Sequence, residues 1–218
     1  LLGIKSEKGT GKTQALSEYL EDYIRAGIPV LVLSHRVQLV RALSARFGID
    51  NAYNFRSSDT KGALGLVLCV DSLHKHGQAN FNPDNWDDFI LIIDEVEQVI
   101  SHTLMSDRTA VKDHRVEVLS NLATLTQNAR QVILSDADLS NRSLDYFTSL
   151  IGSCSREVIH NTYKPAFGRK LYDYNSPESL LDSLMSECED LALAQEEGNT
   201  AGKNILIATD SQRASSTW

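Results

Sequence analysis

The sequence predicts an α/β fold with a mainly parallel sheet flanked by helices. Short runs of branched aliphatic residues recur along the chain, and helical stretches separate them. When helices cover both faces of a parallel sheet, each strand is buried on both sides, so its sequence is a continuous apolar run. The predicted strands are 1–4, 29–33, 64–70, 89–93 and 131–134.

Four segments have apolar residues at the three- and four-residue spacing of an amphipathic helix. In the first of them, Leu16 and Leu20 lie four residues apart, and Gly27 and Pro29 follow its end. Glycine and proline at these positions are typical helix terminators. The predicted helices are 14–25, 37–47, 116–129 and 140–150.

The length of 218 residues suits one full domain and part of another. A polar break near 152 predicts two domains, 1–152 and 153–218. Because the chain begins with Leu1 and ends at Trp218, just after an apolar run, we expect a fragment of a longer protein. In its second part we predict strands at 157–160, 170–174 and 204–208, and an acidic helix that starts at the cap Ser176 and ends near 197.

The charge and the apolar runs limit the class of protein. The net charge is -8, and the segment 173–197 alone holds eight acidic and no basic residues. The acidic and basic residues of the rest of the chain are therefore balanced in number, and nucleic-acid binding is not excluded.

The longest apolar stretch, 64–70, is far shorter than the ~18 residues of a membrane span. Three distant cysteines offer no CxxC pair. We expect a cytoplasmic protein with no membrane partner.

Residues 6–13, Ser-Glu-Lys-Gly-Thr-Gly-Lys-Thr, lie between the first strand and the first helix, as a phosphate-binding loop requires. Glycines allow the backbone N–H groups to face a phosphate, and the helix N-terminus adds partial positive charge. Lys12 is expected to contact the β- and γ-phosphates, and Thr13 to bind Mg²⁺ through its hydroxyl. The strict pattern has glycine where this chain has Ser6. The predicted nucleotide-binding residues are Ser6, Gly9, Thr10, Gly11, Lys12 and Thr13.

Asp94 and Glu95 follow the apolar run 89–93. An acid at the carboxyl end of a buried strand lies at the rim where α/β proteins bind ligands. We predict that Asp94 holds Mg²⁺ together with Thr13, and that Glu95 orients and deprotonates the attacking water. With Lys12, these two acids form the predicted catalytic set. An acidic pair after a strand also fits an ordinary helix start, but the upstream loop favours a nucleotide-hydrolysing enzyme.

Five segments follow one another along the chain: 6–13, 30–36, 69–73, 94–97 and 135–138. In this order they resemble motifs I, Ia, Ib, II and III of superfamily 2 helicases. The Asp-Glu-Val-Glu form of motif II resembles most closely the replication branch, which contains viral origin-binding helicases and related plasmid or phage replication proteins. The resemblance implies a RecA-like ATPase domain that binds ATP and Mg²⁺ and moves along single-stranded or duplex DNA, with RNA not excluded. It also implies that a second RecA-like domain begins within 153–218, and that the protein is cytoplasmic, in a bacterial, phage or plasmid context, or nucleoid-associated.

The resemblance also assigns residues that contact nucleic acid, through backbone phosphates rather than bases. These residues are His35 and Arg36 in motif Ia, Ser72 and Lys75 in motif Ib, and Thr209 in motif IV.

Motif III, with Ser135 and Asp136, is implied to couple the nucleotide site to the nucleic-acid surface. Here Asp-Ala-Asp replaces the commoner Ser-Ala-Thr, so Asp136 could pair with the loop of Glu95 through water or with a basic residue. The family's arginine finger comes from the last motif of the second domain, outside these 218 residues. Such an arginine accelerates hydrolysis by about 10³- to 10⁵-fold, so we expect this chain to bind ATP far better than it hydrolyses it.

Three functions stay open. The first is an ATP-dependent DNA helicase or translocase of a replication protein, with hydrolysis that DNA stimulates. The second is a nucleotide-gated nucleic-acid-binding module that does not unwind DNA. The third is a P-loop NTPase unrelated to nucleic acid, such as a small-molecule kinase. The order of the motifs favours the first.

Overall fold

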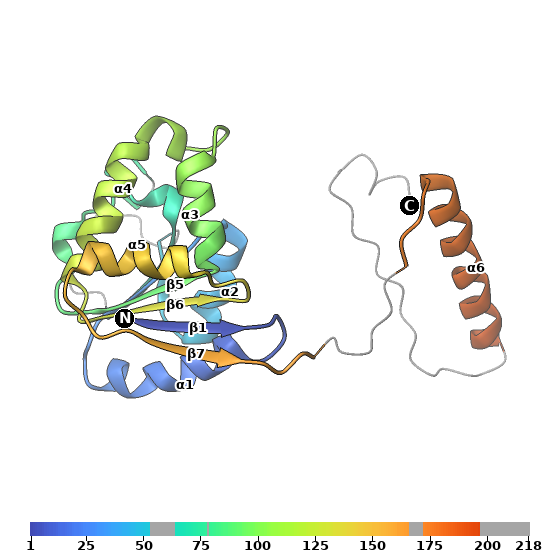
Figure 1. Cartoon of the computed structure of the whole chain (residues 1–218), viewed down its shortest axis with the longest axis horizontal. Helices are drawn as coiled ribbons and strands as arrows, with labels where there is room; N and C mark the ends of the chain where they lie inside the picture. The colour runs from blue at the N-terminus through green and yellow to red at the C-terminus, as the bar shows by residue number, and fades with distance from the viewer. Residues whose placement is uncertain (53–63, 78, 166–171, 197–218) are drawn as a thin grey trace. The chain divides into compact units, whose positions relative to one another are not determined.

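The computed structural model is shown in Figure 1, and it describes residues 1–52, 64–77, 79–165 and 172–196. The chain divides into two compact units, Leu1–Phe167 and Gly168–Trp218. Each unit is described by itself.

A seven-stranded sheet forms the centre of the first unit, with the strand order β3-β4-β2-β5-β6-β1-β7. All neighbouring strands run parallel. This is the α/β, RecA-like arrangement that the sequence predicts. The strands are β1 (Leu2–Ser6), β2 (Val30–Ser34), β3 (Asp50–Asn51), β4 (Gly65–Cys69), β5 (Ile90–Asp94), β6 (Gln131–Asp136) and β7 (Glu157–Asn161).

Helices cover both faces of this sheet, and Figure 1 shows α3, α4 and α5 on one side with α1 on the other. In β5, Ile90 and Ile92 pack with α1 and α2, whereas Leu91 and Ile93 pack with α3, α4 and α5. Both faces of the strand are therefore buried, which explains its uninterrupted apolar sequence. The helices are α1 (Lys12–Arg25), α2 (Val37–Phe47), α3 (Val96–Met105), α4 (Val111–Asn128) and α5 (Asn141–Ile151), with the short 3₁₀ helices η1 (Val70–Ser72) and η2 (Pro83–Asn85).

The first domain does not end at 152 as we expected. β7 pairs with β1 along its whole length, from Leu2 opposite Glu157 to Ser6 opposite Asn161. The sheet thus continues beyond the expected boundary, and the first compact unit runs to Phe167. The polar break near 152 is only a loop between α5 and the edge strand, and the prediction placed the boundary too early for that reason.

The second unit contains α6 (Pro177–Glu196). The Ser176 hydroxyl accepts a hydrogen bond from the backbone N–H of Ser179 at 3.2 Å, which confirms the predicted N-cap. Residues 172–174 are not a strand, while the rest of that predicted strand, the strand at 204–208 and Thr209 lie outside the described residues. Among the helices described in either unit, none combines the length and apolar character that a membrane crossing requires.

Candidate nucleotide-binding site

The loop between β1 and α1 has the backbone geometry of a phosphate-binding loop. Gly9 and Gly11 have φ values of 79° and 85°, in the left-handed region that side chains with a Cβ rarely adopt. Gly11 is the N-cap of α1, and Lys12 is the first residue of the helix. Backbone N–H groups of the loop and the helix N-terminus therefore meet at one place, as an anion site requires.

Ser6, which replaces the consensus glycine, connects this loop to the edge of the sheet. It is only 3% exposed, its hydroxyl lies 2.6 Å from that of Thr10, and it accepts a hydrogen bond from the Asn161 side chain at 3.1 Å. Thr10 in turn donates to the backbone carbonyl of Glu7 at 2.7 Å. A glycine could not form this chain of hydrogen bonds from β7 into the loop.

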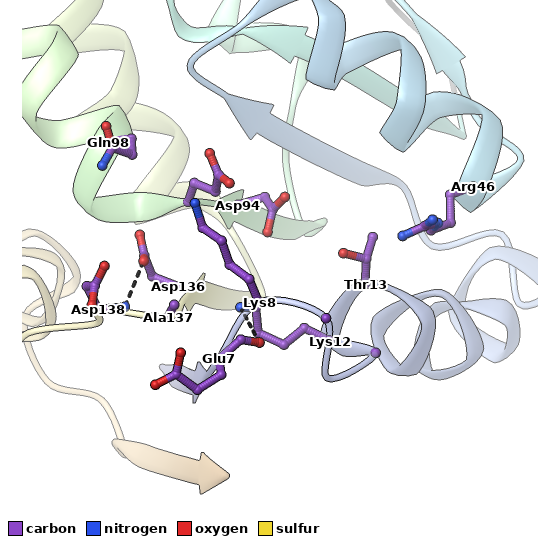
Figure 2. Close-up of a pocket in the computed structure, with 13 residues that line it drawn as sticks. Glu7, Lys8, Lys12, Thr13, Arg46, Asp94, Gln98, Asp136, Ala137 and Asp138 are labelled. Carbon is purple, nitrogen blue, oxygen red and sulfur yellow. Dashed lines mark hydrogen bonds between the residues drawn. The ribbon is translucent and has the colours of Figure 1, made fainter. Parts of the chain in front are cut away.

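The loop lines a cavity of about 230 Å³ at the carboxyl rim of the sheet, drawn in Figure 2. Seven of the residues predicted for nucleotide binding, catalysis or coupling meet there: Gly9, Gly11, Lys12, Thr13, Asp94, Glu95 and Asp136. Ser6, Thr10 and Ser135 do not line the cavity; Ser6 and Thr10 brace the loop, and Ser135 is fully buried. The remaining lining residues had no individual role predicted: Glu7, Lys8, Arg46, Gln98, Ala137 and Asp138.

The strands that carry the loop and the acidic pair are not neighbours. β6 lies between β1 and β5, so that Ser135 is in register with Ile4 on one side and with Asp94 on the other. The carboxyl ends of all three parallel strands still share one rim. The cavity is accordingly lined by residues from all three: the loop after β1, Asp136 of β6 and Asp94 of β5.

Asp94 lies in an electrostatic environment suited to a cation. Burial raises the pKa of its carboxyl group, and the neighbouring Glu95 adds to this effect. The Ser135 hydroxyl and the Lys12 ammonium act in the opposite direction and lower the pKa. A partly desolvated carboxylate beside a threonine hydroxyl is the oxygen-ligand chemistry that Mg²⁺ prefers. Asp94 and Thr13 line the same cavity, so both fit a Mg²⁺ ion there.

Glu95 is held in an unusual backbone conformation. Its φ of 53° lies in the left-handed region, which is uncommon for a residue with a side chain and is found at functional sites. The Glu95 carboxylate lies 3.4 Å from Nδ1 of His35. His35 is buried, and this burial lowers its pKa, although Glu95 opposes the effect. His35, which follows β2, thus lies against Glu95 of the acidic pair, and its contact with nucleic acid stays a prediction.

Asp136 links motif III directly to motif II. Its Oδ2 accepts a hydrogen bond from the backbone N–H of Glu97 at 2.9 Å, and its Oδ1 accepts one from the N–H of Asp138 at 2.9 Å. Glu97 in turn accepts from the N–H of Ser140 at 2.8 Å. Among the described residues, the direct hydrogen-bond partners of Asp136 are therefore backbone N–H groups, one of them in the turn that follows Glu95.

The remaining residues predicted to contact nucleic acid divide into exposed and buried ones. Arg36, at the N-cap of α2, and Lys75 are exposed, whereas Ser72 is only 8% exposed. Beside Ser72, Asp71 accepts a 2.7 Å hydrogen bond from His102 of α3. Helix α3 therefore connects the acidic pair at one end with the motif Ib turn at the other.

The fold and the loop geometry define the class: a RecA-like α/β domain with a glycine-rich loop of the phosphate-binding form at its carboxyl rim. Residues 3–172 match the family described as "Origin of replication binding protein". The chain belongs to this family.

Individual relatives and one solved structure show what the chain resembles. The chain is 30% identical to the replication origin-binding protein of Varicella-zoster virus over 165 residues, which is 73% of this chain and 19% of that protein. It is 35% identical to an uncharacterized protein of Picosynechococcus over 228 aligned positions, 100% of this chain and 22% of that protein. The chain thus spans about a fifth of the length of these relatives. A DEAD box protein from Methanococcus jannaschii aligns at a TM-score of 0.49, with 13% identity, over 72% of this chain and 44% of that one.

Proposed function

We propose that this chain binds ATP with Mg²⁺ and is the first motor domain of an ATP-dependent DNA helicase or translocase within a replication origin-binding protein. One observation carries the proposal: Lys12 and Thr13 from the loop line the same cavity as Asp94 and Glu95 from β5. These four side-chain types suit the phosphate-binding, Mg²⁺-binding and water-orienting roles that ATP hydrolysis uses. The second unit is proposed to open a second RecA-like domain.

Each lining residue has a chemical task in this proposal. The backbone N–H groups at Gly9 and Gly11 and the N-terminus of α1 bind the phosphates, and Lys12 contacts the β- and γ-phosphates. Thr13 and Asp94 hold Mg²⁺, which neutralises charge that develops on the phosphate oxygens. Glu95 accepts a proton from the attacking water.

DNA is the proposed partner because the Varicella-zoster relative is named as an origin-binding protein. Arg36 follows β2, and Lys75 follows the short turn after β4, so both cations lie beyond the carboxyl ends of neighbouring strands. Exposed cations at these positions suit backbone phosphates, which gives binding without sequence readout. Helix α3 is the proposed connection, since it contacts Asp136 near the nucleotide pocket and Asp71 beside motif Ib.

Mg-ATP titration into the purified chain tests the nucleotide site. We expect saturable binding that Lys12→Ala weakens by at least tenfold, because the phosphates lose their main cation. Lys112→Ala, which removes an exposed lysine on α4, is the matched control and should bind as the wild type does. Equal affinity in all three proteins would refute the nucleotide site.

The motor function needs two further measurements. Both use the full-length protein: single-stranded DNA should stimulate its phosphate release, and a flat response across DNA concentrations would rule out a DNA-dependent motor. Strand displacement then separates the motor from a second candidate, a nucleotide-gated binding module, which the relatives' name as origin-binding proteins favours. Such a module would change its affinity for DNA when ATP binds but would displace no strand.

A further inference from the structure

Three ionisable side chains meet on the side of the domain formed by η1 and α4, outside the nucleotide pocket. His74 follows η1, while His114 and Glu117 lie three residues apart on α4. One potential ligand atom from each of the three residues lies within 4.8 Å of those from the other two. The rings of His74 and His114 stack with their centroids 4.0 Å apart, and Nδ1 of His114 is 4.0 Å from the Glu117 carboxylate.

His74 has more hydrogen-bonding capacity than its surroundings use. Its side chain is 3% exposed, and its Nδ1 has no hydrogen-bond partner among the described residues. Buried polar atoms are almost always paired, so an orphaned imidazole nitrogen needs an explanation. Imidazole is the commonest metal ligand among protein side chains.

The backbone of α4 is distorted at this place. His114 has φ of -122° and ψ of 16°, a non-helical conformation within the helix. Kinks in helices have specific causes, and here the kink coincides with the residue that stacks on His74. The distorted residue and Glu117 are one turn apart, so both side chains reach the same side of the helix.

We propose that His74, His114 and Glu117 form a binding site for Zn²⁺. Two imidazoles and one carboxylate are a ligand set that zinc takes in proteins, whereas Mg²⁺ and Ca²⁺ prefer oxygen ligands throughout. Zinc bonds of about 2.0–2.2 Å bring neighbouring ligands closer than they lie here, so the site contracts on binding. His76, whose ring centroid is 5.5 Å from that of His114, is exposed and near enough to supply the fourth ligand.

A metal at this place would fix the motif Ib turn to α4. Two hydrogen bonds already join them: Lys75 donates its backbone N–H to Glu117 at 3.1 Å, and Asn121 donates to the carbonyl of Leu73 at 3.0 Å. Zn²⁺ would add a third, stronger connection next to Lys75, one of the two exposed cations proposed to contact DNA. The site is therefore structural, and it is distinct from the Mg²⁺ site at Asp94.

Zinc titration into the metal-free 218-residue chain tests this site, with Mg²⁺ at saturating concentration to occupy the oxygen ligands around Asp94. We expect one Zn²⁺ per chain by calorimetry. Cobalt, as a probe for zinc, should give the intense visible absorption of a tetrahedral complex with nitrogen and oxygen ligands. No zinc binding, or cobalt in an octahedral environment only, would overturn the proposal.

Ligand variants locate the metal. His114→Asn and Glu117→Gln change partly exposed side chains and should leave the fold intact, as circular dichroism can show. Each should weaken zinc binding by at least tenfold, and zinc should raise the melting temperature of the wild type but not of these variants. His160→Asn, on the exposed strand β7, is the matched control and should bind zinc as the wild type does. Unchanged zinc affinity in His114→Asn would place the metal elsewhere and refute the site.

Discussion

The Asp136 carboxylate accepts a hydrogen bond from the backbone N–H of Glu97 at 2.9 Å, across the boundary between β6 and α3. The first N–H groups of any helix lack partners within the helix, and the N-cap of α3, Glu95, makes no side-chain capping bond. Asp136 supplies that cap from another strand, and its negative charge also interacts favourably with the helix N-terminus. The position of α3, and of the acidic pair before it, therefore depends on a residue of motif III.

Asp136→Asn should destabilise the domain by about 1–3 kcal/mol, because a buried charge-assisted hydrogen bond becomes a weaker neutral one. Chemical denaturation measures this change. Asp138→Asn is the control, since Asp138 is exposed and lies two residues away. Its effect should stay within about 0.5 kcal/mol. If both variants unfolded at the same denaturant concentration, Asp136 would not hold α3 in place.

Local patterns were sufficient to predict the central strands and most helices. The runs at β2, β4 and β5 are buried on both faces, and so their sequences are continuous apolar stretches. β7 was recognised as a strand but not as part of the same sheet, because its pairing with β1 joins residues about 155 positions apart. Helix α3 was not predicted, and α4 begins at Val111, before the predicted start.

Site residues that lie close together in the sequence were predicted. Those that only the packing of distant segments brings to the site were missed. The loop and the acidic pair are recognisable because their residues are adjacent in the chain. No pattern near Arg46 indicates that it lines the cavity, since only the packing of α2 beside α1 places it there. For the same reason His35 was assigned to nucleic acid, although the fold directs it toward Glu95.

Arg46→Ala should weaken ATP binding by about tenfold, the effect of losing one charge-assisted contact to the nucleotide, worth roughly 1.4 kcal/mol. Arg46 lies at the end of α2, and its side chain lines the cavity near Thr13 (Figure 2). Isothermal titration with Mg-ATP gives the affinity. Arg41→Ala removes an exposed arginine of the same helix that does not line the cavity, and it should bind ATP normally. A normal affinity in Arg46→Ala would show that this arginine does not contact the nucleotide.

His35→Ala should slow single-turnover ATP hydrolysis by roughly tenfold to a hundredfold, as the loss of other orienting partners does, while ATP affinity stays the same. The reason is that His35 contacts Glu95, the proposed base, and does not line the cavity. Quenched-flow measurement of phosphate formation separates the rate from the affinity. His160→Ala, on an exposed strand, is the control. A loss of DNA affinity with an unchanged hydrolysis rate would instead favour the original assignment of His35 to nucleic acid.

Cys69 should resist alkylation in the folded chain, whereas the exposed Cys188 should react. Burial raises the pKa of the Cys69 thiol from 9.0 to about 11, so the reactive thiolate is scarce near pH 8. Mass spectrometry after brief treatment with iodoacetamide gives the modification of each cysteine. Rapid labelling of Cys69 under native conditions would contradict its burial at the end of β4.

The same shift predicts a dependence of stability on pH. Between pH 9.0 and about 11 the unfolded chain loses the Cys69 proton while the folded chain retains it. The unfolded state then binds fewer protons, so stability falls as the pH rises through this window, by an amount on the order of 2–3 kcal/mol for this group. Other groups titrate in this window too.

The difference in the free energy of unfolding between wild type and Cys69→Ala therefore isolates the thiol. The variant should be less stable at pH 8, since the substitution leaves a small cavity, and this difference in stability should shrink towards pH 11. A constant difference across the window would mean that the Cys69 pKa is the same in both states.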